Sequence, residues 1–131
     1  MASITTISER VRELSSGSVY LLLQDDLGVP IGSGSLNTLT LSLYDKRTGT
    51  VINSRNNLNA LNANNVTVYS SVQGSGTTAY TVLWEVQPAD NALVGTRELE
   101  PHRAIFEYTW GSGKRDHHGI DTVIEAELEV S

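Results

Sequence analysis

The sequence predicts an all-β domain, an antiparallel sandwich of six or seven strands in two sheets. Three segments, at 79–86, 103–110 and 120–130, alternate between two sets of side chains, as strands with one buried face do. The expected strands start roughly 10 to 20 residues apart, with turns rich in glycine between them. Short strands joined in this way pack most simply as two antiparallel sheets.

The individual strands follow from alternation and from the residues that bound them. Four more are expected at 18–23, 36–45, 49–53 and 65–72, each flanked by Gly, Asn, Asp or Pro. Alternation places Trp84 and Phe106 on inward faces, so both should belong to the core. On the last strand, one face carries apolar residues and the opposite face carries acidic ones, including Glu125, Glu127 and Glu129.

The N-terminal segment predicts a different structure, a short amphipathic helix. Thr6 and Glu9 have the spacing of a capping box. Apolar residues recur at spacings of three and four: Ile4, Ile7, Val11 and Leu14. A helix this short is not stable alone in water, so its apolar stripe should pack on the domain or on a neighbouring subunit. We therefore expect residues 1–17 to form an arm, mobile in the isolated chain, and residues 18–131 to form the sandwich.

The segment 53–66 contains seven asparagines in fourteen positions, together with Leu58 and Leu61. Asparagine tolerates the left-handed backbone conformation and hydrogen-bonds its own main chain in Asx turns. A flexible linker would instead be rich in Gly and Ser and would not need leucines. We expect an ordered loop of a single domain, with both leucines packed beneath it.

Length, charge and cysteine content exclude several classes of protein. A chain of 131 residues has the size of one domain. Fifteen acidic and nine basic residues give a net charge of −6, which disfavours binding to a phosphate backbone. We expect no membrane span and no signal peptide, and hence synthesis in the cytoplasm. The absence of cysteine removes disulfides and thiolate zinc sites.

Two groups of histidines are candidates for catalysis or metal binding. His102 lies close to Glu98 and Glu100, as a general base would, but no nucleophile can be identified for it, so a loop-closing hydrogen bond is the simpler interpretation. His117 and His118 are adjacent, and neighbours in an extended chain point to opposite sides, which makes a poor metal chelate. We therefore predict no catalytic, cofactor-binding or metal-binding residues.

Three quoted stretches carry a resemblance to a known family. They are "LTLSLYDKRTGTVINSRNNLNALNANNVTV", "TVLWEVQPADNAL" and "ELEPHRAIFEYTW", which fall within residues 39–110. This text resembles small immunoglobulin-like structural proteins encoded among the virion genes of tailed bacteriophages. The "PADN" turn is similar to the crossover between the two sheets of such domains. Residues 1–17 and the tip "GSGKRDHH" depart from the pattern.

The resemblance implies a virion component without chemistry of its own, present in multiple symmetric copies and in contact with portal, capsid or tail proteins. We expect a non-enzymatic assembly protein, most simply at the neck between head and tail. Capsid decoration is the nearest alternative, a glycan- or receptor-binding module is a second, and a hydrolase is a distant third. The residues expected to contact partners are Ile4, Ile7, Val11, Leu14, Trp110, Glu125, Glu127 and Glu129.

Overall fold

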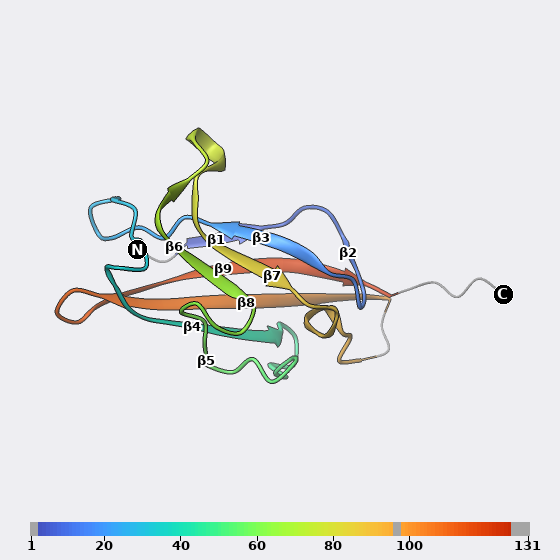
Figure 1. Ribbon diagram of the computed structural model, residues 1–131. Coiled ribbons are helices and arrows are strands. Elements are labelled where there is room, and N and C mark those ends of the chain that lie inside the picture. Colours follow the sequence, from blue (N-terminus) through green and yellow to red (C-terminus); the bar gives the residue numbers. More distant parts are fainter. Residues whose placement is uncertain (1–2, 96–97, 127–131) are drawn as a thin grey trace.

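The computed structural model describes residues 3–95 and 98–126, which form two β-sheets packed face to face (Figure 1). The larger sheet has the order β1-β9-β8-β4-β5, with β2 also paired to β9. Its strands are β1 (Ser3–Thr6), β2 (Val11–Arg12), β4 (Leu36–Asp45), β5 (Leu58–Asn59), β8 (Leu99–Trp110) and β9 (Lys114–Glu125). The smaller sheet has the order β3-β7-β6, from β3 (Gly17–Leu21), β7 (Tyr80–Val86) and β6 (Val66–Gln73). The predicted all-β, two-sheet architecture is confirmed. The expected number of strands is wrong, because the described residues form nine strands instead of six or seven, and β1, β2 and β5 were not expected.

The hairpin of β8 and β9 is the longest element of the larger sheet and runs across the length of the view in Figure 1. Its register is regular from Leu99 opposite Glu125 to Trp110 opposite Lys114. On β8, every second residue from Glu100 to Tyr108 is buried. The alternation in the sequence predicted this burial from Ala104 onward. The burial extends further toward the start of the strand than predicted and includes two polar residues.

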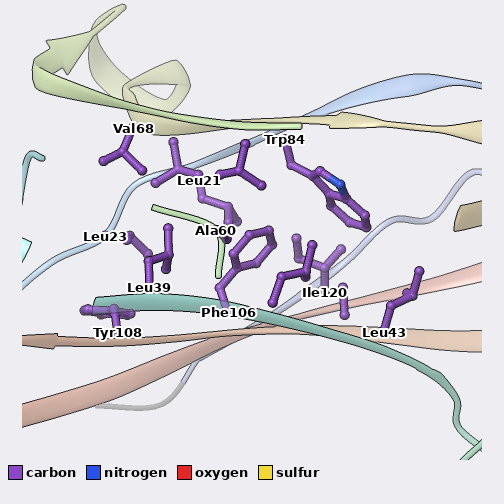
Figure 2. Close-up of a cluster of buried hydrophobic side chains, with 14 of the residues drawn as sticks. Leu21, Leu23, Leu39, Leu43, Ala60, Val68, Trp84, Phe106, Tyr108 and Ile120 are labelled. Carbon is purple, nitrogen blue, oxygen red and sulfur yellow. The ribbon is translucent and has the colours of Figure 1, made fainter. Parts of the chain in front are cut away.

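The core lies between the sheets, where side chains from both layers meet (Figure 2). Trp84 of β7 and Phe106 of β8 contact each other edge to face, with ring centroids 5.7 Å apart and an interplanar angle of 72°. Phe106 is completely buried and Trp84 nearly so, which confirms their predicted inward positions. Aromatic pairs of this geometry add to the free energy gained from burial alone.

The predicted N-terminal helix is wrong, because the segment forms strands instead. Residues 3–6 and 11–12 pair in parallel with β9. Four consecutive residues at 4–7 are β-branched, which disfavours a helix and favours a pleated strand. The backbone hydrogen bonds offered by the edge of β9 therefore outweigh the three-and-four spacing, and no helix spans the described part of the segment.

The asparagine tract is an ordered loop, as predicted. Asn53, Asn57, Asn62, Asn64 and Asn65 all have positive φ, the backbone region that asparagine tolerates better than most residues. Two of their side chains bond main-chain groups: Asn62 Oδ1 accepts the N–H of Val68 at 2.7 Å, and Asn64 Nδ2 donates to the carbonyl of Asn59 at 2.7 Å. The tract also contains the short strand β5 and the buried Ala60.

Leu58 and Leu61 of this loop are half-buried, and Leu61 packs against the core, so their predicted placement beneath the loop holds in part. The strand expected at 49–53 is wrong. Only Val51 makes an isolated bridge, to Tyr44, because a tight turn follows β4 and leaves too little chain for a ladder.

Two short 3-10 helices complete the described residues, η1 (Gly76–Thr78) and η2 (Pro88–Asn91). The "PADN" turn is η2, and Asp90 Oδ2 accepts the N–H of Gln87 at 2.8 Å. Neither helix, in the part of the chain that the structure describes, is long and apolar enough to cross a membrane.

Candidate functional site

The four apolar residues predicted to form one partner-binding stripe face two different environments. Ile4 and Leu14 are more than half exposed, whereas Ile7 and Val11 are half-buried. Ile7 packs against the core, and both half-buried residues line an interior cavity. The extended conformation explains this division. In a strand, residues four apart share a face but residues three apart lie on opposite faces, so a spacing of three and four does not form a single stripe. Ile4 and Leu14 remain available to a partner.

Trp110, at the end of β8, is half-buried and packs against the core. Its ring stacks on Tyr108 with centroids 5.5 Å apart and an interplanar angle of 27°. Glu125 is exposed at the end of β9, with a carboxylate oxygen 3.9 Å from Arg10 Nη1. Glu127 and Glu129 lie outside the described residues. Of the three glutamates named for the last strand, Glu125 is the one that lies among the described residues.

Three tyrosines form a surface cluster that sequence reasoning missed. Tyr80 contacts Tyr20 and Tyr69 edge to face, with ring centroids 4.7 and 5.8 Å apart. The residues come from all three strands of the smaller sheet, and Tyr20 is 55% exposed while the other two are half-buried. Each strand contributes only one of these rings, so the cluster becomes visible only through the pairing of the strands.

A buried Glu–His pair lies at the start of β8. His102 Nε2 is 2.6 Å from Glu100 Oε1, and both side chains are 1% exposed. Glu100 also accepts the backbone N–H groups of Val94 and Gly95, at 2.8 and 2.9 Å. Burial alone would raise the pKa of Glu100, but these hydrogen bonds and the imidazole outweigh burial, and the pKa is lowered. The loop-closing role expected of His102 is therefore shared with Glu100.

The tautomer of His102 follows from this pairing. A carboxylate only accepts hydrogen bonds, so Nε2 carries the proton that bonds Glu100. In the neutral ring, Nδ1 then holds a lone pair. Nδ1 is buried and has no hydrogen-bond partner within the described part of the chain. Extending the alternation of β8 back by four residues from Ala104 would have placed His102 and Glu100 inside from the sequence alone.

The adjacent histidines lie in β9 and not in the turn before it. His117 is exposed, while His118 is half-buried and its Nε2 is 2.7 Å from the hydroxyl of Thr5 in β1. Burial lowers the pKa of His118. Among residues 3–95 and 98–126, no group of three or more His, Cys, Asp or Glu side chains is arranged to hold a metal ion.

The larger sheet carries an ionic cluster between β8 and β9. Arg103 bonds Asp121 through two parallel contacts, Nε to Oδ1 at 2.6 Å and Nη2 to Oδ2 at 2.8 Å. Lys46 Nζ reaches the same carboxylate at 3.1 Å. The hydrogen bond from Arg103, helped by Lys46, lowers the pKa of Asp121 despite its burial, and Asp121 in turn raises the pKa of Arg103.

An interior cavity of about 210 Å³ lies between the sheets, beneath the N-terminal segment. The exposed residues 16–18 form part of its lining, which places its rim at the surface. Trp84 and His102 both line it, and their buried nitrogens Nε1 and Nδ1 have no hydrogen-bond partner among the described residues. Its apolar walls include Ile7, Val11, Val19, Leu43, Ala104 and Ile120.

Comparison with known proteins identifies no relative: no family model, no curated protein and no solved structure matches this chain.

Proposed function

We propose that the chain is a non-enzymatic structural protein of a tailed-phage particle, an immunoglobulin-like sandwich that joins other virion proteins at the neck between head and tail. The observation that carries the proposal is the open edge of the larger sheet. β1 and β2 both pair with β9 on one side, and neither has a second strand partner in the described residues. An unpaired edge offers N–H and C=O groups to another chain.

Exposed apolar side chains accompany this edge and favour a protein partner. Ile4, on β1, is 56% exposed and Leu14, just after β2, is 55% exposed. Side chains of this type at an open edge contribute buried apolar area when a neighbouring subunit covers them. The immunoglobulin-like character is supported by the crossover at η2, which connects β7 of the smaller sheet to β8 of the larger one.

The neck is favoured over capsid decoration by the form of the two edges of the larger sheet. In a neck ring, each copy contacts two identical neighbours through two different, opposite surfaces. Such head-to-tail contacts are the heterologous interfaces that form closed rings. β1 and β2 supply one such surface, and β5 with the asparagine loop lies at the other edge of the same sheet. Capsid decoration remains the alternative position.

Incorporation into particles tests the proposal. Quantitative mass spectrometry of gradient-purified particles should detect the chain at a fixed ratio to the portal protein. A double substitution, Ile4→Lys with Leu14→Lys, should lower incorporation about tenfold, which corresponds to a loss of about 1.4 kcal/mol of contact free energy. Val72→Lys is the matched control, because Val72 is also exposed, at 42%, but lies on β6 of the smaller sheet. Equal incorporation of both variants would contradict a role for this edge.

A glycan- or receptor-binding module is the second candidate, and the tyrosine cluster favours it. Partly exposed aromatic rings on a sheet face offer stacking surfaces to sugar rings. A glycan-array signal that is lost in Tyr20→Ala or Trp110→Ala, with an unchanged melting temperature, would support this candidate over the structural role. If the array gives no signal, the structural role in assembly is the better supported function.

The proposal includes the absence of catalysis. His102 has an oriented imidazole, but within the described residues no hydroxyl lies within hydrogen-bond distance of its free Nδ1, as a nucleophile would. A broad hydrolase screen of the pure protein should detect no turnover. Activity that disappears when His102, His117 and His118 are replaced together in a folded variant would contradict this part of the proposal.

A further inference from the structure

We infer that the cavity between the sheets is a binding site for a small, neutral, mainly apolar molecule that carries one hydroxyl group, with phenols as the ligand class. This inference is independent of the proposed virion role. It is based on the juxtaposition of an apolar cavity with two buried nitrogens that lack partners, Trp84 Nε1 and His102 Nδ1.

The volume of the cavity sets the size of the ligand. An apolar cavity of about 150 Å³ is large enough to hold benzene. The cavity measures about 210 Å³, so it has room for a substituted single ring but not for a larger fused system. Its aliphatic walls, which include Val19, Leu43 and Ile120, match the surface of such a ring.

The two nitrogens set the polar group of the ligand. The indole Nε1 of Trp84 is only a donor. Nδ1 of His102 is an acceptor in the neutral ring, because Nε2–H is held by the carboxylate of Glu100. A hydroxyl group suits both nitrogens chemically, because it can accept a hydrogen bond from an N–H donor and donate one to an acceptor nitrogen. A burial penalty applies to each nitrogen while it is unpaired, so a ligand that satisfies both gains affinity over one that cannot.

The charges around the cavity favour a neutral ligand. Among the residues that the structure describes, the lining contains no lysine or arginine, so an anion would find no partner there for its charge. Asp90 is the one acidic side chain among the described lining residues, and its oxygens already bond Arg55, Asn53 and Gln87. A cation would therefore not find a free carboxylate either, and desolvating a charge in an apolar cavity is unfavourable.

The test is a titration of the full chain with p-cresol, followed through the indole N–H signals in ¹H–¹⁵N spectra. The two tryptophans give two signals, which Trp110→Phe assigns. p-Cresol should shift the Trp84 signal downfield to saturation and leave that of Trp110 unchanged. Toluene, which has the same carbon frame without the hydroxyl, should bind at least about tenfold more weakly. Benzoate should not bind. A Trp84 signal that does not saturate, or equal affinity for toluene and p-cresol, would overturn the inference.

A cavity-filling variant gives an independent measurement. Val19→Phe adds a ring at a half-buried wall residue, and Val72→Phe adds the same ring at an exposed site of the smaller sheet, outside the cavity. Calorimetric binding of p-cresol should be abolished in the first variant and unchanged in the second. Unchanged binding in a folded Val19→Phe variant would contradict the assignment. If Val19→Phe does not fold, the titration of the unaltered chain decides the question by itself.

Discussion

Arg55 and Asp90 form a buried ion pair that ties the asparagine loop to η2. Arg55 Nε lies 2.5 Å from Asp90 Oδ1, Nη2 lies 3.1 Å from Oδ2, and both side chains are almost completely buried. The guanidinium also donates to the carbonyl of Asn64 and the side chain of Asn65, both at 3.1 Å, and its Cζ lies 5.9 Å from the centroid of the Trp84 ring. The pair thus joins two connections that lie far apart in the sequence.

Removing one partner of this pair should be strongly destabilising. Arg55→Met leaves the carboxylate of Asp90 buried without its cation, and an uncompensated buried charge typically costs about 3 to 5 kcal/mol. Urea unfolding at neutral pH measures the loss. The matched control is Arg115→Met, which removes an exposed ion pair with Glu107 and should cost less than about 1 kcal/mol. Similar losses in both variants would show that the loop is not held by this pair.

The central aromatic contact should dominate the stability of the core. Phe106→Ala removes a completely buried ring from the contact with Trp84 and should cost about 3 to 5 kcal/mol. Glu107→Ala, one residue further on the opposite face of β8, should cost less than about 1 kcal/mol, because its ion pair with Arg115 is exposed. Thermal melts that fail to separate the two variants would contradict the assignment of the inward face.

Asp121 should make stability depend on pH in the acid range. Its pKa is lowered by Arg103 and Lys46, so the folded chain holds this proton less tightly than the unfolded chain does. The stabilisation is therefore present above the unfolded pKa, at about 4, and is lost as the pH falls through the folded pKa. The stability difference between the natural chain and Asp121→Asn should be larger at pH 7 than at pH 3.

Chemical denaturation at these two pH values measures the difference. Asp26→Asn is the control, because Asp26 pairs with Lys114 on a fully exposed surface where solvent screens the interaction. It should change stability little at either pH. A deficit in Asp121→Asn that is as large at pH 3 as at pH 7 would mean that the carboxylate contributes through packing and not through its charge.

The N-terminal strands should be protected from hydrogen exchange in the isolated chain. The N–H of Ile7 donates to the carbonyl of Asp121 at 2.9 Å, and that of Glu13 donates to the carbonyl of Glu125 at 2.8 Å. Both bonds lie at a sheet edge, so protection should be measurable but weaker than that of the central strand β8. Exchange at the rate of an unfolded peptide would instead support the mobile arm expected from the sequence.

Local patterns were sufficient to predict the long strands but not their neighbours in space. Alternation located β7, β8 and the part of β9 from residue 120 onward, because each buries one face against the other sheet, whereas β4 was located by the residues that bound it. The N-terminal segment was misassigned because its three-and-four spacing is local, whereas its pairing with β9 joins residues more than 100 positions apart. Such parallel pairing leaves no mark in a short window of sequence.

The same limit applies to the candidate sites. The tyrosine cluster, the Arg55–Asp90 pair and the cavity each combine residues from separate elements, so no single stretch of sequence reveals them. The proximity of His102 to Glu100 was visible in the sequence, and the structure adds their burial and the free Nδ1. Ile4 and Leu14 belong to the stripe that was expected to pack on the domain or on a neighbouring subunit; both are exposed, and the helix that was expected to present them does not form.

The most direct test of the proposed function is electron microscopy of particles produced by a phage that lacks this gene. A neck protein predicts filled heads and complete tails that accumulate unjoined, and joining should be restored when the purified chain is added to the extract. The Ile4→Lys, Leu14→Lys double variant should restore it poorly and Val72→Lys fully. Joined, infectious particles of normal yield and stability in the absence of the gene would contradict the structural role, while joined particles with fragile heads would move the chain from the neck to the capsid surface.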